Sequence, residues 1–340
     1  MDRFADQDGL PFVSVVMPVR NESAYVERSL RSVLNQDYPS HLLEVIVADG
    51  MSTDGTRDIV RDIQATHPYV TMIDNPGLVA PTALNLATAA ARGTIIVRVD
   101  GHCEIATDYV TNCVRHLLED GVDGVGGSLV TVGESDTARA IAAAMSSPFG
   151  VGGAAFRTVK DRTMLADTIP FPAYTRKIIE LAGPYDETFV RNQDDEYNYR
   201  IRKLGGKLLL AADVHSRYYS RANLRSLTRQ YYGYGLWKAP VLWKHPRQMK
   251  ARQFVPAAFV AAVAIGFLFS PFSARARRLL IGTLIAYAGA SGFASVRTAR
   301  QTEWRYLPKL PAAFAALHLS YGAGFVLGII KRLAGGQPGR

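Results

Sequence analysis

The sequence predicts an α/β protein with a mostly parallel, doubly wound sheet, followed by interfacial and transmembrane helices. Two patterns indicate this fold class. Over the first two hundred residues, apolar runs typical of buried strands alternate with segments of helical periodicity. In the last third of the 340 residues, three long apolar stretches follow a basic segment, as in many membrane-attached chains.

The predicted strands are short runs rich in β-branched residues. Strands and helices are expected to alternate, with strands at 12–19, 43–50, 70–75 and 94–101 and helices at 25–36, 55–66 and 80–93. Strands that are apolar throughout are buried on both faces, as parallel strands are when helices cover both sides of the sheet. Ligands bind such sheets at the carboxyl ends of the strands.

Two later stretches differ in composition. The stretch between residues 133 and 168 is rich in Gly, Ala and Ser, and we interpret it as a mobile segment over a bound ligand, with an ordinary surface excursion as the alternative. Further on, "EYNYRIRKLGG" predicts a helix that Gly205 and Gly206 end.

The last third of the chain is basic. Residues 217–300 contain fourteen Lys or Arg and no Asp or Glu, so the net charge of +9 leaves −5 (9 − 14) for the rest. Arg217, Arg221, Arg225 and Arg229 recur every four residues, which predicts a basic helical stripe on anionic headgroups, with a solvated basic face as the alternative. We therefore predict a basic interfacial region over 217–253, and no nucleic acid partner.

The apolar stretches are 254–272, 279–296 and 310–330, and none of them contains a charged residue. Each has roughly the ~20 residues that a helix needs to cross a bilayer. We predict a membrane domain over 254–332 with about three hydrophobic segments, and buried core helices are the alternative. The N-terminus shows no secretory signal, and Cys103 and Cys113 form no disulfide framework, which fits a cytosolic setting for residues 1–216.

Polar residues stand where the predicted strands end. Asn21 and Glu22 follow the first strand, and the next three strands end in Asp49, Asp74 and Asp100. One such carboxylate is most often a helix cap or a turn residue, the role we expect for Asp54. Several carboxylates that converge on one edge of a sheet indicate a ligand site instead.

Five motifs stand in the order and spacing of one known family. They are "VSVVMPVRNE", "VIVADGMSTDGT", "ALNLATAAARGTIIVRVDG", "GPYDETF" and "DDEYNYRIRKLGG". Over residues 12–215 the chain resembles glycosyltransferase family 2, the inverting enzymes with a GT-A fold. With its apolar tail it is most similar to membrane-attached bacterial exopolysaccharide glucosyltransferases of the succinoglycan type.

The resemblance implies an activity and its partners. A hexose, with glucose as the expected sugar, would pass from a UDP-sugar to a polyprenyl-diphosphate-linked saccharide at the bacterial inner membrane. The GT-A domain, residues 1–216, would face the cytoplasm, and membrane lipids would be further partners. The oligomeric state is left open, a homo-oligomer included. A sugar nucleotidyltransferase is one alternative, although "PVRNES" lacks its Gly-rich phosphate loop, and a non-catalytic membrane scaffold or export component is another.

The resemblance also implies the donor site. Asp49 matches the carboxylate that contacts the nucleobase, and Pro18, Arg20 and Glu22 follow the first strand, where relatives hold uracil and ribose. Asp100 and Gly101 would lie at the sugar and diphosphate.

A divalent cation, Mn²⁺ or Mg²⁺, would offset the charge of the departing diphosphate. Asp100 offers a hard oxygen ligand, and His102 can point to the same side of an extended segment. Many family members carry a carboxylate where this chain has His102, whereas an Asp-x-His variant binds manganese in other GT-A enzymes. His215 resembles a third ligand of some relatives, with a structural histidine as the alternative.

Inversion needs one general base on the acceptor hydroxyl. The family pattern places a Glu-Asp pair before the "RIRK" helix, which here becomes Asp194-Asp195, with Asp195 as the expected base and Asp194 as its neighbour. Acidic residues at a helix N-terminus also favour the helix dipole, which is the alternative reading. At the acceptor site we expect Gln193 and, from a loose match to a motif of processive relatives, Arg229, Gln230 and Trp237.

Overall fold

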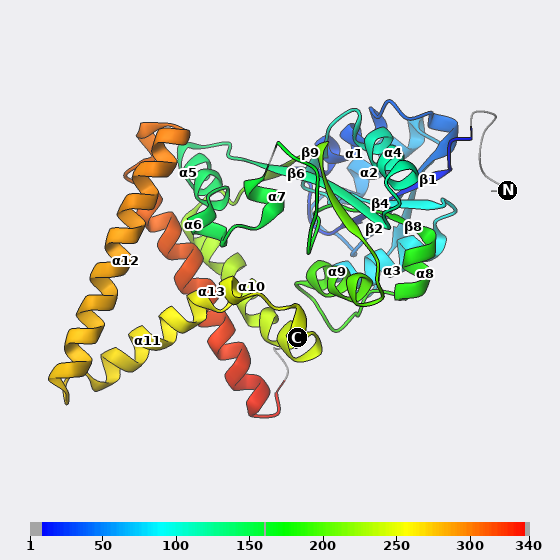
Figure 1. Cartoon of the computed structure of the whole chain (residues 1–340). Helices are drawn as coiled ribbons and strands as arrows, with labels where there is room; N and C mark the ends of the chain where they lie inside the picture. The colour runs from blue at the N-terminus through cyan, green and yellow to red at the C-terminus, as the bar shows by residue number, and fades with distance from the viewer. Residues whose placement is uncertain (1–8, 160, 337–340) are drawn as a thin grey trace. The chain divides into compact units, whose positions relative to one another are not determined.

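The computed structural model describes residues 9–159 and 161–336, which form two compact units. The first unit comprises the described residues up to Val130 and those from Val159 to Tyr218, and it contains most of a large sheet (Figure 1). The second unit comprises Thr131–Thr158 and the described residues from Tyr219 on, and it is mainly helical.

One half of the sheet is parallel, as predicted. Its order is β3-β2-β1-β4, formed by β1 (Val13–Val19), β2 (Leu43–Asp49), β3 (Val70–Asp74) and β4 (Ile95–Arg98). The register aligns Val19 with Asp49 and Asp49 with Asp74, so the carboxyl ends of these strands form one edge. The connecting helices α1 (Val26–Leu34), α2 (Thr56–Thr66) and α3 (Ala80–Ala90) lie where helical periodicity predicted them.

The other half of the sheet is antiparallel, so the sheet is mixed rather than mostly parallel. It continues from β4 through β8 (Ala173–Thr175), β6 (Gly124–Val132), β9 (Leu208–Tyr219) and β5 (Cys103–Ile105), and β7 (Met164–Leu165) pairs with β9. Three of these strands are only two or three residues long, and β6 begins with glycines. A Cβ on Gly127 would lie 1.7 Å from the carbonyl oxygen of Val214, so this glycine allows β9 to approach.

Helices cover both faces of the sheet in the first unit. In Figure 1, α1, α2 and α4 (Tyr109–Glu119) lie on one face, and α3, α8 (Arg176–Ala182) and α9 (Gln193–Lys203) lie on the other. The core between them is built from buried strand residues such as Val15, Val45 and Val97. The predicted GT-A type of α/β fold is thereby confirmed in its layers and its parallel half.

The Gly, Ala and Ser-rich stretch after residue 133 contains three helices, and its expected mobility over a bound ligand stays a prediction. It contains α5 (Asp136–Met145), α6 (Pro148–Val151) and α7 (Ala155–Thr158). Ala140, Ile141 and Ala144 of α5 are buried, and α5 packs against α13 (Leu310–Leu333). Small side chains let helices approach closely, which fits the alanine-rich face of α5 at this contact.

The remaining helices of the second unit are α10 (Leu224–Lys244), α11 (Val255–Phe269), α12 (Ala274–Gln301) and α13. Short 3₁₀ turns lie at Pro246–Gln248, Ala251–Gln253 and Trp304–Tyr306, and another lies at Ser40–Leu42 in the first unit. By length and composition, α12 and α13 are long and apolar enough to cross a membrane. Because α11 has 15 residues, it spans only about 22 Å, less than the ~30 Å hydrocarbon core. Of the three expected segments, two therefore form helices of membrane-spanning length in the part of the chain described.

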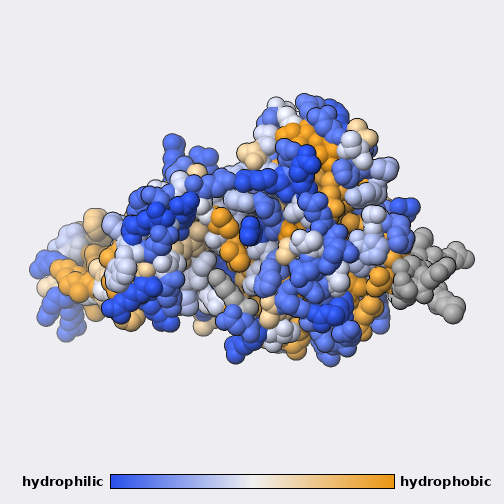
Figure 2. Space-filling view, turned by 90° about the horizontal axis from the view of Figure 1, so that it is seen from above, coloured by the Kyte–Doolittle hydropathy of each residue, from blue (hydrophilic) through white to orange (hydrophobic). Residues whose placement is uncertain are grey.

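Large apolar side chains are exposed where α11 ends and α12 begins. Phe267, Phe272 and Leu279 are 74%, 85% and 72% exposed. Figure 2 shows apolar patches beside strongly hydrophilic ones on the part of the chain that contains α11 and α12. Exposure of such large apolar side chains is unfavourable in water and common on surfaces that contact lipid.

The four regularly spaced arginines do not share one helix, so the predicted stripe is wrong. Arg217 lies on β9 and Arg221 in the connection that follows, and only Arg225 and Arg229 lie on α10. The helix begins at Leu224 because the Asn223 side chain caps it, accepting a hydrogen bond from the backbone N–H of Ser226 at 2.9 Å. All four arginines are exposed.

Candidate active site at the carboxyl ends of the strands

The loops that follow the parallel strands have strained backbones. Asn21 after β1 and Met51 after β2 have φ angles of 53° and 55°, and Asn192 before α9 has 58°. Left-handed conformations are uncommon for residues other than glycine and concentrate at functional sites. The side chain of Asn21 holds two loops together, because its Oδ1 accepts a hydrogen bond from the backbone N–H of Thr53 at 2.9 Å.

Asp49 ends β2 and is fully buried. Its Oδ2 accepts hydrogen bonds from the backbone N–H of Ser52 at 3.0 Å and from Arg57 at 2.7 Å. Its Oδ1 is also buried and has no hydrogen-bond partner among the residues that the structure describes. Since an unpaired buried oxygen is costly, a donor such as a water molecule or a ligand N–H group is expected at this atom.

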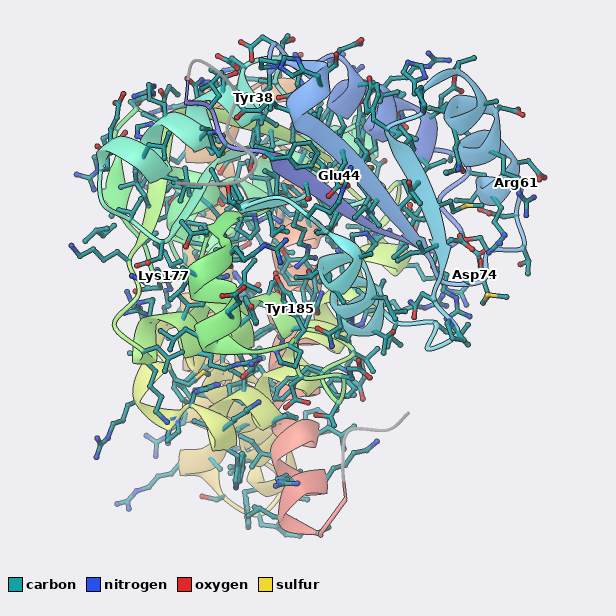
Figure 3. All side chains as sticks on the ribbon, turned by 90° about the vertical axis from the view of Figure 1, so that its right-hand side faces the viewer. Tyr38, Glu44, Arg61, Asp74, Lys177 and Tyr185 are labelled. Atoms are coloured by element: carbon teal, nitrogen blue, oxygen red, sulfur yellow. The ribbon has the colours of Figure 1, made fainter. Side chains whose placement is uncertain are left out.

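Arg57 of α2 joins the ends of β2 and β3. It donates to Asp49 and, at 2.7 Å, to Oδ1 of Asp74, whose side chain is 60% exposed. The hydrogen bonds to Asp74 and Asp49 raise the pKa of Arg57. Figure 3 shows Asp74 at the end of β3, away from Glu44 near the start of β2.

Asp54 has the turn role expected of it. Its Oδ1 accepts hydrogen bonds from the backbone N–H and the hydroxyl of Thr56, and its Oδ2 accepts one from the backbone N–H of Ser23. Its slight burial would raise the pKa of Asp54, but the hydrogen bonds from Thr56 and Ser23 outweigh burial and lower it. Asp54 therefore fixes the loop before α2 and joins it to the loop after β1, where Ser23 lies.

Pro18 and Arg20 border the same edge. Pro18 lies in β1 opposite Ala48, and the exposed Arg20 donates to the carbonyl oxygen of Leu78 at 3.1 Å. The side chain of Arg20 lies against Gly50, where an added Cβ would be 3.1 Å from it. Both residues thus lie beside the loop that follows Asp49.

Asp100 follows β4 and is held by a residue that the sequence reasoning missed. Arg98 donates from Nε to Oδ1 of Asp100 at 2.8 Å and from Nη2 to Oδ2 at 3.1 Å, and its side chain is 9% exposed. Burial disfavours the charge of Arg98, but Asp100 outweighs burial and raises the pKa of Arg98. The available signal was a lone charge in the apolar run "TIIVRVDG", two residues before a carboxylate and so on the same face of the strand.

Gly101 and His102 lie against Glu22. A Cβ on Gly101 would come within 2.9 Å of Val19 and 3.3 Å of the Glu22 side chain, so only glycine fits here without movement. Nδ1 of His102 lies 2.9 Å from Oε1 of Glu22, and the imidazole packs edge-on against Tyr218 at 5.4 Å between ring centroids. If His102 is neutral, this contact makes Nδ1 the donor and leaves the lone pair on Nε2.

His215 lies elsewhere along the antiparallel strands. The carbonyl oxygen of His215 accepts a hydrogen bond from the backbone N–H of Ala106. Cys103 of β5 pairs with Tyr218 of β9, and the same register places His102 opposite position 219. Four residues of strand separate the two positions, about 13 Å. The His215 side chain is exposed, and its Nδ1 is 3.1 Å from the hydroxyl of Ser128. The structure therefore does not bring His215 next to His102 in this ladder.

The acidic residues of α9 face different neighbours. Glu196 is fully buried and pairs with Arg200 at 2.7 Å, which in turn donates to the carbonyl oxygens of Ala182 and Pro184. Asp194 is exposed and Asp195 partly exposed, and the backbone N–H of Asp195 donates to Oδ1 of Asp194 at 3.0 Å. Glu196 is thus a structural residue, which leaves Asp194 and Asp195 for chemistry.

The charge of Asp194 affects Arg98, the residue that pairs with Asp100. It contributes to raising the pKa of Arg98, after the larger contributions of Asp100 and Tyr185. Gln193, the first residue of α9, is buried. Asp194 thus lies within electrostatic reach of the residue that holds Asp100.

The acceptor residues expected from the basic segment lie on α10 in the second unit. Arg229 is exposed, whereas Gln230 and Trp237 are buried. Nε2 of Gln230 donates to the hydroxyl of Tyr234 at 2.9 Å. Burial gives Gln230 and Trp237 a packing role within this unit.

A divalent cation would find two protein ligands here rather than a complete set. No group of three or more His, Cys, Asp and Glu able to hold a metal occurs within residues 9–159 and 161–336. Asp100 and His102 nevertheless suit such an ion: the pairing of a histidine nitrogen with a carboxylate, as in His102 and Glu22, is typical of metal-ligating histidines. The remaining ligands would have to come from a bound substrate.

Comparisons with known proteins give the relatives of this chain. The model of the family described as glycosyl transferase family 2 matches residues 14–180. The chain is 32% identical to the succinoglycan biosynthesis protein ExoA of Rhizobium meliloti over 313 residues, 92% of this chain and 93% of that protein. It is 26% identical over 336 residues to a dolichyl N-acetyl-alpha-D-glucosaminyl phosphate glucuronosyltransferase of Methanococcus voltae, with 94% of this chain and 98% of that protein covered.

A solved structure shares the fold. The mannosyltransferase of Pyrobaculum calidifontis, in complex with GDP-Man and Mn²⁺, matches with a TM-score of 0.58 and 24% identity over 90% of this chain and 87% of that one. The match extends beyond the first 216 residues, so that protein also has counterparts of parts of the second unit.

Proposed function

Because the chain belongs to glycosyl transferase family 2, we propose that it transfers a hexose, with inversion, from a UDP-sugar to a polyprenyl-diphosphate-linked saccharide. The observation that carries this proposal is the buried Oδ1 of Asp49 at the carboxyl edge of the parallel strands, which has no partner within residues 9–159 and 161–336. A nucleobase with an N–H on its edge, such as uracil, would satisfy it. The loop residues Pro18 and Arg20 lie next to this point and would flank the nucleoside.

The donor diphosphate would lie at the end of β4. Asp100 and His102 would hold Mn²⁺ or Mg²⁺ there, with Glu22 orienting the imidazole of His102. When bound, the cation would offset the negative charge of the leaving diphosphate. The Mn²⁺ bound to the mannosyltransferase of similar fold supports this choice of metal.

Transfer would proceed by one displacement. A carboxylate of the Asp194-Asp195 pair takes the proton of the acceptor hydroxyl, whose oxygen forms a bond to the anomeric carbon as the bond to the diphosphate breaks. UDP departs with the electron pair of that bond, and the anomeric centre is inverted. The charge of Asp194 acts on Arg98, and so on the Asp100 side of the site. Asp195, which the motif count singles out, is the proposed base, with Asp194 as its neighbour.

A lipid-linked acceptor fits the second unit. Apolar side chains of α11 and α13 line a hollow of about 550 Å³, among them Val260, Phe267 and Leu319. The relative from Methanococcus voltae is named for a dolichyl phosphate acceptor, and the one from Rhizobium meliloti for succinoglycan biosynthesis. Gln193 and Arg229 remain the proposed acceptor residues, whereas the positions of His215, Gln230 and Trp237 give no support to the metal and acceptor roles expected of them.

The membrane arrangement is proposed as follows: residues 1–216 face the cytoplasm, and the second unit attaches to the inner membrane. Arg275, Arg277 and Arg278 follow α11 directly, and a fully crossing α11 would carry them to the outer side, against the positive-inside rule. We therefore expect a cysteine placed at Ser273, in a variant that lacks Cys103 and Cys113, to resist an impermeant maleimide in intact cells and to react once the cells are opened. Labelling in intact cells would show that α11 crosses.

A donor screen tests the function. The purified chain in lipid nanodiscs is given UDP-, GDP- and dTDP-hexoses, a polyprenyl-diphosphate saccharide and Mn²⁺ or Mg²⁺, and released nucleoside diphosphate is measured. UDP release that needs the acceptor is expected, with the product anomer determined by NMR. Release of pyrophosphate from UTP and a sugar phosphate would support a nucleotidyltransferase instead, and no turnover of any donor would support a scaffold.

A further inference from the structure

Asn198 is a polar residue buried in the middle of α9, the helix that bears Asp194 and Asp195. It is 1% exposed. Asparagine is a poor helix former, and a buried amide is costly unless its hydrogen bonds are made. Because alanine would form this helix better, the contacts of the amide indicate why an asparagine occupies the position.

The amide of Asn198 makes three hydrogen bonds. Its Oδ1 accepts from the hydroxyl of Tyr174 at 2.8 Å, and its Nδ2 donates to the carbonyl oxygen of Asp194 at 2.9 Å and to the hydroxyl oxygen of Thr168 at 3.2 Å. A carbonyl oxygen only accepts, so the contact with Asp194 identifies the nitrogen end of the amide. The hydroxyl of Tyr174 is therefore the donor to Oδ1, and burial, which raises the pKa of Tyr174, keeps its proton in place.

One of these bonds holds the peptide unit that precedes the proposed base. The carbonyl of Asp194 and the N–H of Asp195 belong to the same planar peptide. Asn198 holds its carbonyl end, and its N–H end donates to Oδ1 of Asp194 at 3.0 Å. The helix follows Asn192, whose φ of 58° is left-handed, and such a residue persists only where its surroundings hold it. The backbone at Asp195 is thus held from both ends of one peptide.

The bond to Tyr174 ties this turn to the sheet. Tyr174 lies in β8, where the antiparallel register pairs it with Ile96 of β4, the strand that leads to Asp100. Its ring fits there because a glycine, Gly124 of β6, lies beside it: a Cβ on Gly124 would be 2.7 Å from Cδ1 of Tyr174. The same ring lies near that of Tyr197 on α9, with centroids 5.8 Å apart and planes inclined by 56°. Tyr174 thus joins β8 to α9 through its hydroxyl and its ring.

We propose that Asn198 is a positioning residue: with Tyr174 it fixes the first turn of α9, and so the carboxylate of Asp195, relative to β8 and the neighbouring donor strand β4. The inference rests on the proposed function, because it takes Asp195 as the base and Asp100 as a donor residue. Its consequence is that a change at Asn198 or Tyr174 should slow transfer and leave UDP binding, which depends on Asp49 and Asp100, intact.

Tyr174→Phe is the mildest test. It removes the hydroxyl but keeps the ring between β8 and α9 and the bond from Asn198 to Asp194. We expect kcat per UDP-binding site to fall about fivefold, the loss expected for one neutral hydrogen bond, and the Kd for UDP with Mn²⁺ to stay within about twofold. Calorimetry gives both the Kd and the number of binding sites, so a loss of folded protein does not lower kcat per site.

Asn198→Ala removes all three hydrogen bonds of the amide. It should lower kcat per site about 30-fold, again with UDP affinity kept. The double variant with both substitutions should turn over as slowly as Asn198→Ala alone, because the hydroxyl of Tyr174 acts on α9 through the amide. A purely structural amide would instead lower the Tm and the number of binding sites and leave kcat per site unchanged.

Tyr38→Phe is the matched control. Tyr38 is also buried, and its hydroxyl donates to the carbonyl oxygen of Pro11, which precedes β1 and so lies at the edge of the sheet opposite the carboxyl ends of the parallel strands. A lower Tm with unchanged kcat and UDP affinity is expected for this variant.

The outcomes separate the inference from the proposed function. If the wild-type protein releases no nucleotide from any donor, the proposed function fails, and this inference fails with it. If the wild type is active, only the inference is overturned by a Tyr174→Phe or Asn198→Ala variant with wild-type kcat per site, or by effects that multiply in the double variant. A loss of UDP affinity that parallels the loss of kcat would overturn it as well, because the amide would then not act on the base alone.

Discussion

Asp49→Asn should abolish tight nucleotide binding although it keeps the size and shape of the side chain. An amide offers one acceptor oxygen and one NH₂ donor. At the Oδ2 position the side chain meets two donors, the backbone N–H of Ser52 and Arg57. At the Oδ1 position it would meet the N–H of a nucleobase. In either orientation of the amide, its NH₂ group faces another donor.

The size of the effect follows from these contacts. The substitution loses a hydrogen bond to a charged acceptor and leaves a buried donor unpaired, which together cost about 3 kcal/mol. Because each 1.4 kcal/mol is tenfold in Kd, UDP should bind about 150-fold more weakly. The removal of charge beside Arg57 adds to this, since Arg57 is only 20% exposed.

Calorimetric titration with UDP measures the effect, and Asp74→Asn is the matched control. Asp74 pairs with the same arginine at 2.7 Å, but its side chain is 60% exposed, so this ion pair contributes at most about 1 kcal/mol. UDP affinity should then change by no more than about fivefold. If Asp49→Asn binds UDP within threefold of the wild type, the assignment of Oδ1 to a nucleobase is wrong.

Three further predictions concern the metal, the base and pH. Glu22→Gln should weaken Mn²⁺ binding, read by EPR in the presence of UDP, by about tenfold or more, because Glu22 orients His102; unchanged affinity would remove Glu22 from this role. Asp195→Asn should lower kcat by about 100-fold or more with UDP affinity kept, and Asp194→Asn should lower it less; the reverse order would make Asp194 the base. Burial would raise the pKa of Asp213, but the hydrogen bond with His116 outweighs burial and lowers this pKa. The ionised Asp213 therefore stabilises the fold above its unfolded pKa of about 3.9, and this stabilisation is lost as pH falls through the lower folded pKa. Asp213→Asn should remove that part of the decrease of the Tm in acid, and a variant whose Tm falls with pH as in the wild type would contradict this.

The parallel half of the fold was predictable because its signals are local. Each of its strands is a single apolar run, and each connecting helix has its own apolar face, so residue spacing was enough. The antiparallel half depends on strands of two or three residues and on glycines such as Gly127, whose reason is the approach of β9. Such pairings are set by partners far apart in the chain, and no local pattern shows them.

The candidate site was likewise predictable only in part. The carboxylates at the strand ends were predictable, since a parallel sheet gathers the ends of its strands at one edge. Their partners were not: Glu22 was assigned to the nucleotide, yet it contacts His102, 80 residues away along the chain. The four arginines of the basic segment had a helical spacing, but β9 continues to Tyr219, so Arg217 lies on this strand and not on a helix.

Arg98 shows most clearly what residue spacing cannot supply. Within "TIIVRVDG" a single charge interrupts an apolar strand, and the spacing of apolar residues assigns no role to it. In the structure Arg98 is buried and pairs with the partly buried Asp100, and an unpaired guanidinium at the same place would be strongly destabilising. A charged residue inside an apolar strand is therefore best read together with the carboxylate two positions on, which shares its face. Read as a pair, Arg98 and Asp100 predict a carboxylate held in a fixed position at the end of β4, which is what the proposed donor site requires.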